Sequence, residues 1–147
     1  MLTWIFRPLC LIVALSASAV ISGCGGGTAS SISSSQGSLD AGLKAFQEKD
    51  YAAAETHLAA AIANGHLQPD LGENALRSLA VARIRLDKLT AAESDLLSLS
   101  MGAADMDLYW VACAELALKK GDQEAAKDAV TQARELNPDV ELPPELQ

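Results

Sequence analysis

The sequence predicts an all-α fold in which six helices form three helix–turn–helix units. Three observations lead to this class. The composition is rich in alanine and leucine and 4% aromatic, which favours packed helices over a sheet sandwich. From Leu39 onward, apolar residues recur at helical spacing, and no segment sustains the two-residue alternation of a strand. Residues that favour turns and helix caps divide this region at regular intervals.

The helix boundaries follow from the capping and turn residues. Residues that favour helix starts or ends occur at Asp50, Asn64-Gly65, Asp70, Thr90, Gly121, Asp122 and Asn137-Pro138. Thr90 and Glu93 also fit a capping box, in which each side chain bonds a free backbone N–H. Helices are therefore expected at about 39–49, 52–63, 71–86, 91–99, 106–120 and 123–136.

The helical pairs repeat one spacing pattern. It reads Asp50-Tyr51-x-x-Ala54-x-x-x-Leu58-x-x-Ala61, then Lys88-Leu89-x-x-Ala92-x-x-x-Leu96-x-x-Leu99, then Asp122-Gln123-x-x-Ala126-x-x-x-Val130-x-x-Ala133. The interval in numbering is 34 from the second unit to the third (123 − 89) and 38 from the first to the second (89 − 51). We expect the additional residues of the first interval to lie in the turn at 65–69.

A helix–turn–helix period of about 34 residues is typical of the tetratricopeptide repeat (TPR), and the third unit resembles that family most closely. Trp110-x-x-Cys113-Ala114-x-x-Ala117 stands where the family has Trp-x-x-Leu-Gly-x-x-Tyr, and Pro138 stands at the terminal proline. The resemblance covers 39–138 and implies a right-handed α-solenoid of three TPR units. Close approach of the paired helices is expected at the small residues Gly42, Ala54, Ala80, Ala92, Ala114 and Ala126.

Two units depart from the family pattern. The first has Ser38 and Ala45 where the family has aromatic residues, and the second has Arg83 in the second aromatic place. We expect looser packing at these positions and no change of fold.

The N-terminus resembles the leader of a bacterial lipoprotein precursor. Arg7 is the only charge before Asp40, and the 13-residue apolar run at 9–21 is short for a membrane span but suits a signal peptide. Ile21-Ser22-Gly23-Cys24 resembles a lipobox, which implies removal of residues 1–23 and attachment of acyl chains such as palmitate to Cys24. An uncleaved anchor, or ordinary cleavage near Ala17-Ser18-Ala19, is the alternative.

The rest of the chain divides into three parts. Residues 24–38 hold the lipidated cysteine and a Gly/Ser-rich tether, which is expected to be a flexible coil. Residues 39–138 form the TPR domain, and the tail at 139–147 is expected to be extended and to return against the last helix. The lipid would anchor the chain to a membrane of the cell envelope on its extracytoplasmic side, which is the periplasmic face in a Gram-negative cell.

Charge and reactive residues exclude several functions. The formal net charge of −8 disfavours nucleic acid, whose affinity comes largely from Lys and Arg on phosphates. His57 and His66 lack partners at metal-ligand spacing, and no phosphate loop or nucleophile elbow occurs. Cys113 is expected to be a small buried hydrophobe, with a reactive thiol as the alternative. We therefore expect no enzyme activity, catalytic residue, metal site or cofactor.

The TPR resemblance implies a binding groove, because in that family the first helix of each pair lines a concave surface that binds a peptide or a partner helix. The ten residues expected to line it are Leu39, Leu43, Phe46, Asn74, Arg77, Val81, Arg85, Val111, Glu115 and Lys119. Its basic members would attract an acidic segment. The alternative is that the apolar members belong to the core and the arginines pair with nearby acids.

These observations predict a membrane-anchored adaptor or scaffold that recruits a protein of the cell envelope. The family's clamp for C-terminal carboxylates is not expected, because Leu43, Val81 and Glu115 stand where that clamp has asparagine. The alternative function is a structural component that self-associates in an envelope assembly or secretion complex. The partner, the process, the choice of inner or outer membrane and the oligomeric state do not follow from the sequence.

Overall fold

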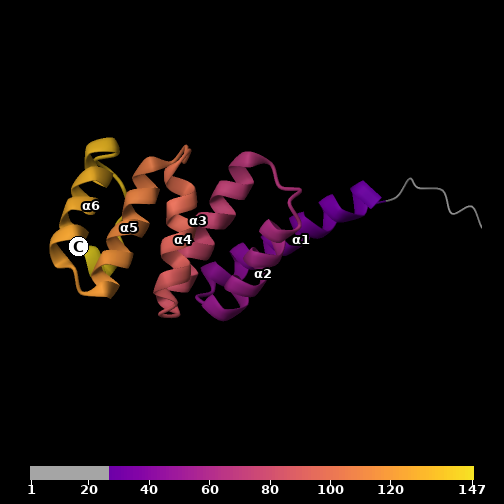
Figure 1. Ribbon diagram of the computed structural model, residues 1–147, viewed down its shortest axis with the longest axis horizontal. Helices are drawn as coiled ribbons and strands as arrows, with labels where there is room; N and C mark the ends of the chain where they lie inside the picture. Colours follow the sequence, from indigo (N-terminus) through magenta and orange to yellow (C-terminus); the bar gives the residue numbers. More distant parts are fainter. Residues whose placement is uncertain (1–26) are drawn as a thin grey trace, which may run out of the picture.

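The computed structural model describes residues 27–147, with side chains from residue 32 onward (Figure 1). These residues form α1 Gly27–Gln47, α2 Tyr51–Ala63, α3 Pro69–Arg85, α4 Leu89–Ser100, α5 Met106–Lys120, α6 Gln123–Leu136 and the 3₁₀ helix η1 Pro144–Leu146. No strand occurs within this part of the chain. The prediction of an all-α chain with six helices is confirmed, and the bounds from α2 onward agree with it to within two residues.

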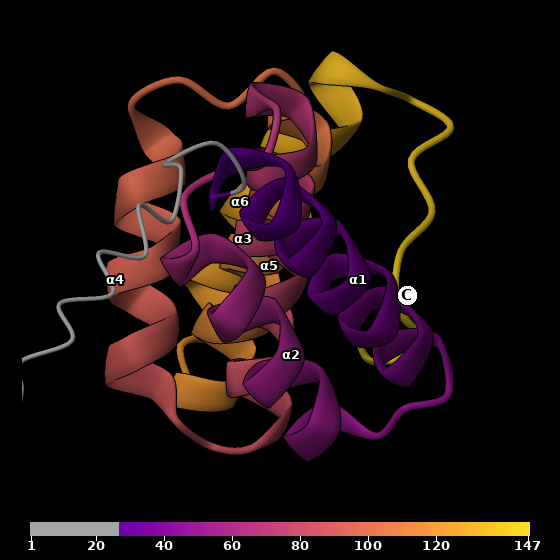
Figure 2. The same cartoon turned by 90° about the vertical axis from the view of Figure 1, so that its right-hand side faces the viewer.

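The helices pack as three consecutive pairs, α1 with α2, α3 with α4 and α5 with α6. The pairs follow one another along the long axis of the molecule (Figure 1). Because α3 also contacts both α1 and α5, these three helices form a continuous layer, whose exposed surface we call the inner face. Viewed along the long axis, α4 lies on the opposite side of the stack from α1 (Figure 2).

The turn inside each helical pair has the same structure. The residue two places before the second helix adopts a left-handed backbone conformation, with φ of 62° at Lys49, 58° at Asp87 and 83° at Gly121. The N–H of each bonds the carbonyl three residues earlier, and the next N–H bonds the carbonyl five residues before it. This pair of bonds is the Schellman motif, which satisfies the free carbonyls at a helix end. Lys49 and Asp87 adopt it although a side chain disfavours a positive φ.

The Schellman turns repeat at the spacing found in the sequence. The interval in numbering is 38 from Lys49 to Asp87 (87 − 49) and 34 from Asp87 to Gly121 (121 − 87). The expectation that the turn at 65–69 holds the additional residues is wrong. They lie mainly in the helices, because α2 and α3 have 13 and 17 residues where α4 and α5 have 12 and 15.

Two of the predicted N-caps form and two do not. The side chains of Asp50 and Asp122 accept hydrogen bonds from the backbone N–H three residues on, at 3.1 and 3.0 Å. The capping box at Thr90 is absent, because α4 already begins at Leu89, directly after its Schellman turn. At α3, Pro69 occupies the first helical position, where its fixed φ suits the helix and its missing N–H costs nothing. Asp70 therefore lies inside the first turn of α3.

Helix α1 begins earlier than the sequence predicts. It starts at Gly27, so the expectation of a flexible coil is wrong for residues 27–38. The cause is tertiary packing: Ser35 and Leu39 are both fully buried and continue the helix beyond the residues that favour it. At about 1.5 Å per residue α1 is roughly 12 Å longer than α2, so its first turns project beyond the stack (Figure 1). The leader and Cys24 lie outside the described residues.

Three apolar clusters follow one another through the stack. The first joins α1, α2 and α3, and the second joins α3, α4 and α5. The third joins α5, α6 and the tail. The six small residues predicted to permit close helix approach are all buried. At Gly42, an added Cβ would lie 2.7 Å from Cγ of Leu58, so only glycine fits between α1 and α2.

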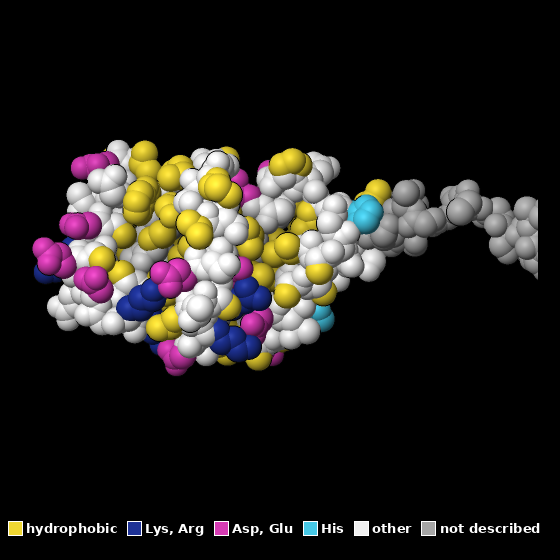
Figure 3. All heavy atoms as spheres, in the orientation of Figure 1, with side chains coloured by type: hydrophobic (Ala, Val, Ile, Leu, Met, Phe, Trp, Pro, Cys, Tyr) yellow, Lys and Arg dark blue, Asp and Glu magenta, His cyan; other side chains and the backbone are white. Residues whose placement is uncertain are grey.

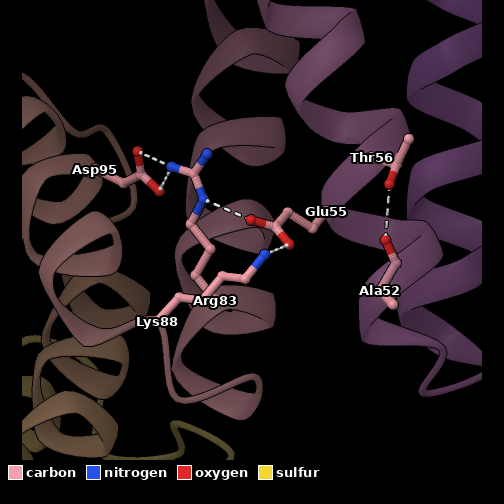
Figure 4. Close-up of polar contacts among 6 residues, drawn as sticks. All are labelled: Ala52, Glu55, Thr56, Arg83, Lys88 and Asp95. Atoms are coloured by element: carbon pink, nitrogen blue, oxygen red, sulfur yellow. Dashed lines mark hydrogen bonds and ion pairs between the residues drawn. The ribbon is translucent and has the colours of Figure 1, made fainter.

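Arg83, the departure from the family pattern in the second unit, bridges three helices (Figure 4). Its Nη1 donates to both carboxylate oxygens of Asp95 on α4, at 2.8 and 2.7 Å, and its Nε donates to Glu55 on α2 at 3.4 Å. Glu55 also accepts a hydrogen bond of 2.6 Å from Lys88. We call these four residues the outer ion cluster. It holds α2, α3 and α4 together where the family has an aromatic side chain.

Candidate functional site

The inner face carries a hollow of about 420 Å³ that is open to solvent. We call it the α1–α3–α5 hollow. It is lined by Leu43, Phe46, Gln47, Asn74, Arg77, Ser78, Val81, Leu108, Val111, Ala112 and Glu115. Seven of the ten groove residues expected from the sequence are in this lining, namely Leu43, Phe46, Asn74, Arg77, Val81, Val111 and Glu115. Side chains from three helices that are well separated in the chain are thus brought onto one surface.

The hollow has an apolar floor and a polar edge. Leu43, Phe46 and Val81 are half-buried and leave part of their apolar surface open. Phe46 is fixed by an edge-on contact with Tyr51, whose ring centroid lies 5.9 Å away. Such a floor favours binding of a partner in two ways. Covering it releases water from apolar surface, and its side chains, which are already fixed, lose little entropy.

Three of the expected groove residues lie elsewhere. Leu39 is 1% exposed and belongs to the first apolar cluster, so it is core, as the alternative interpretation holds. Arg85 lies at the C-terminal end of α3 beside the hollow, and Lys119 lies exposed at the end of α5. Four further residues line the hollow that are not among these ten, namely Gln47, Ser78, Leu108 and Ala112. Each lies three or four residues from another lining residue of its helix, and that spacing is the signal that identifies them.

The expected basic cluster does not form a positive surface. Arg77 Nη1 lies 3.2 Å from Asp105, and its Nη2 donates to Asn74 at 3.1 Å. Lys119 Nζ lies 3.1 Å from Asp87. On the face shown in Figure 3, basic and acidic side chains of the described residues lie close to one another. The pairing of these basic side chains with nearby acids agrees with the alternative interpretation. Long-range electrostatic attraction of acidic partners is therefore not expected.

Arg85 joins the hollow to the C-terminal tail (139–147). Its Nη2 lies 2.7 Å from Glu115 Oε2, and its Nη1 donates to Glu145 of the tail at 2.7 Å. Burial raises the pKa of Glu115, whose side chain is 8% exposed, and the charge of Arg85 opposes that rise. The hydrogen bond from Arg85 lowers the pKa of Glu145. Arg85 therefore carries one deeply buried carboxylate partner and one at the surface.

The tail returns to the inner face, on the side of α1 (Figure 2). Val140 and Leu142 are buried against Val111 of α5 and Ala133 of α6. The expectation of a tail that folds back on the last helix is thus met in part, because α5 and α3 supply contacts as well. The expectation of an extended tail is wrong for Pro144–Leu146, which form the 3₁₀ helix η1. Sequence alone could not pair Glu145 with Arg85, which lies 60 residues earlier.

A second hollow of about 310 Å³ lies between α4, α5 and α6 and contains Tyr109 and Cys113. Burial raises the pKa of the Cys113 thiol and raises the pKa of Tyr109 to about 12. Both groups are therefore neutral near pH 7, and neither is an activated nucleophile. Among the described residues, no cluster of His, Cys, Asp and Glu suits a metal ion, and no helix combines the length and hydrophobicity needed to cross a membrane.

No protein-family model matches the sequence, and comparison with curated proteins and with solved structures gives no significant match.

Proposed function

We propose that the chain is a bacterial lipoprotein that anchors a TPR domain to a membrane of the cell envelope and recruits another protein through its inner face. In this proposal Cys24 carries the lipid, residues 39–138 form a right-handed solenoid of three TPR units, and the partner contributes a peptide or a helix. The protein has no catalytic role of its own and acts as an adaptor.

The repeat supports the TPR part of the proposal. Three Schellman turns, at Lys49, Asp87 and Gly121, occur at the same point of each helical pair. The first helices of the pairs contact one another in order, as they do when helical hairpins stack into a solenoid. Each hairpin buries its apolar side against the next, and the tail covers the last one.

The observation that carries the binding function is the α1–α3–α5 hollow. It is formed by one helix from each pair, its floor is apolar, and polar groups at Gln47, Asn74 and Arg77 stand around it. An apolar floor supplies affinity, and polar groups at its edge fix the orientation of the occupant. A volume of about 420 Å³ suits a few side chains of a partner segment.

Site-specific photocrosslinking in cells tests this function. A photoreactive amino acid is placed at Gln47, which is exposed and lines the hollow, and at the exposed Ser98 on α4 as the matched control. We expect a defined crosslinked protein from position 47 and none from position 98. Val81→Gln, which makes the floor polar, should remove the crosslink while circular dichroism shows the helices intact. Equal crosslinking from both positions, or a crosslink unaffected by Val81→Gln, would contradict the proposal.

Lipid attachment is tested separately. In a bacterial host, Cys24→Ser should abolish labelling by a palmitate analogue and release the protein from the membrane fraction, whereas Cys10→Ser should change neither. Membrane release without loss of labelling would show that another residue carries the acyl chain.

A second candidate function, self-association within an envelope assembly, is favoured by two exposed apolar side chains at the C-terminal end of α4. Leu97 is 68% and Met101 85% exposed, and they are one helical turn apart. Large apolar side chains exposed together mark interaction surfaces. Light scattering over a range of concentrations separates the candidates: self-association through α4 requires a mass that rises with concentration and falls back in Leu97→Gln/Met101→Gln.

A further inference from the structure

The C-terminal tail and the α1–α3–α5 hollow occupy one continuous surface. Val140 and Leu142 of the tail lie in a cluster with Val111, and Leu108 packs against that cluster. Leu108 and Val111 also line the hollow. The tail therefore covers α6 and the adjoining α5 part of the inner face, and the part formed by α1 and α3 stays open.

Arg85 links the tail to the α1–α3–α5 hollow through two ion pairs. On one side it pairs with Glu115, which lines the hollow, and on the other with Glu145 of the tail. Each carboxylate lies 2.7 Å from a different guanidinium nitrogen. Glu145 is 50% exposed, whereas Glu115 is buried, so only the tail carboxylate can be exchanged without opening the helical stack.

The tail presents its two contacts on either side of a proline pair. Leu142 and Glu145 are separated by Pro143 and Pro144, and Pro143 has φ −55° and ψ 151°, a polyproline II conformation. Pro144 then begins the 3₁₀ helix η1, which carries Glu145. Because proline fixes φ, a segment of this kind loses little conformational freedom on binding. The inner face thus already holds a short ligand, supplied by the chain itself.

Beyond Leu142 the tail packs against α5 and pairs with Arg85, but its contact with α6 is incomplete. An open hollow of about 520 Å³ lies between this part of the tail and α6, lined on the tail side by Glu145, Leu146 and Gln147. Close packing is the rule where segments are held permanently, so such a gap marks a contact that is easily broken. None of residues 139–147 lines the α1–α3–α5 hollow, so Leu43, Phe46 and Val81 stay open.

We propose that the tail is a displaceable internal ligand, and that the partner is a short segment with an aliphatic residue and a carboxylate three positions later that takes the place of Leu142 and Glu145. This inference rests on the proposed adaptor function and names the chemistry of its ligand. A partner segment that reaches Arg85 and also covers the open apolar floor outcompetes the tail, because it buries more apolar surface. In the absence of a partner, the tail shields Val111 and neutralises Arg85.

Binding of a fluorescent peptide with the sequence of residues 139–147 tests the proposal on the full chain. In the parent protein the attached tail competes at a high effective concentration, so the peptide binds weakly. In the variant Leu142→Ser/Glu145→Gln the attached tail is released, and the peptide should bind at least about tenfold more tightly. Glu141→Gln, which changes an exposed tail carboxylate, is the matched control and should behave like the parent.

Two further measurements identify the contact. A peptide with glutamine in place of Glu145 should bind the released variant about tenfold more weakly, since a charge-assisted hydrogen bond to Arg85 is lost. Arg85→Gln, added to the released variant, should have the same effect. Equal affinity of parent and released variant, with helices intact by circular dichroism, overturns the proposal, as does a peptide affinity that is unaffected by Arg85→Gln.

A second copy of the chain is the competing occupant. If the parent doubles in mass with concentration and Glu145→Gln abolishes that doubling, the tails are exchanged between copies and a separate partner is ruled out as the tail's competitor. The adaptor function fails by a different result, namely the absence of a crosslink from position 47. A crosslink that persists while the peptide shows no competition leaves the adaptor function standing and removes the displaceable tail.

Discussion

Two arginines on α3, Arg83 and Arg85, show how the same side chain serves two different purposes in this molecule. They are two residues apart and therefore point to opposite sides of the helix. Arg83 lies in the outer ion cluster, where Asp95 of α4 and Glu55 of α2 hold it (Figure 4). Arg85 lies at the inner face, between Glu115 of α5 and Glu145 of the tail.

The difference lies in what carries the partners. Both acids of Arg83 are on helices and are less than a fifth exposed, so neither can leave unless helices separate. Of the acids of Arg85, Glu115 is on α5, and Glu145, whose side chain is half exposed, is on the short 3₁₀ helix of the tail. A charge pair between helices fixes the fold, whereas a pair with a detachable segment can be exchanged. This division has measurable consequences for stability and for the response to acid.

Removal of one acid from each arginine should have unequal effects on stability. Asp95→Ala takes away two short hydrogen bonds and leaves a largely buried Arg83 with one distant partner, so unfolding should become easier by about 2 kcal/mol. Glu145→Ala removes a partly exposed ion pair and should cost less than about 0.5 kcal/mol. Urea unfolding followed by circular dichroism measures both. A cost for Glu145→Ala as large as that for Asp95→Ala would show that the tail is part of the folding core.

Replacement of each arginine by lysine should again destabilise the protein more at Arg83 than at Arg85, with smaller losses of unfolding free energy than removal of the acids. A lysine has one nitrogen and cannot reach Glu55 and Asp95 together, so Arg83→Lys should cost about 1 kcal/mol. Arg85→Lys retains a cation for the buried Glu115 and gives up the weaker tail contact, for a cost within about 0.5 kcal/mol. Thermal unfolding compares the two. Equal shifts in Tm would remove the distinction between an outer structural cluster and an inner exchangeable one.

The helical part of this comparison could be predicted from the sequence, because helix periodicity and caps are local properties. The predicted bounds from α2 onward agree with the structure to within two residues. That Leu43, Arg77, Val81 and Glu115 share a surface follows from the resemblance to the TPR family, not from periodicity alone. The early start of α1 could not be predicted, because Gly and Ser disfavour helices and only packing of Ser35 and Leu39 overrides that preference.

The charge partners could not be predicted for a related reason. Arg83 and Asp95 are 12 residues apart and Arg85 and Glu145 are 60 apart, so each pairing depends on how helices turn relative to one another. The sequence shows more acidic than basic residues, but it does not show which acid pairs with which cation. The left-handed turn at Lys49 has no signal in the sequence, and that at Asp87 has only a weak one, because aspartate adopts a positive φ more often than most residues but far less often than glycine.

The smallest expected effect is the release of the tail by acid. The hydrogen bond from Arg85 lowers the pKa of Glu145, so the tail contact is fully present above the ordinary glutamate value of about 4.3 and is lost as the pH falls through the lowered pKa. Arg85, Glu115 and the charge of Lys49 face this carboxylate. The NMR shift of the Leu146 amide, next to Glu145, should therefore titrate with a midpoint below about 4.3.

Glu145→Gln supplies the control for that titration, since its tail shifts should be unchanged over the same pH range. The outer ion cluster responds differently to acid. The hydrogen bond from Lys88 lowers the pKa of Glu55, so Glu55 keeps its charge and its contact with Arg83 below the ordinary glutamate value, whereas burial raises the pKa of Asp95 against the pull of Arg83. The apolar clusters that join α2, α3 and α4 do not titrate. Acid should thus loosen the tail while α2, α3 and α4 remain packed. Loss of helix signal at the same midpoint as the tail shifts would show that the two arginines belong to one cooperative unit, and that the tail is not separately detachable.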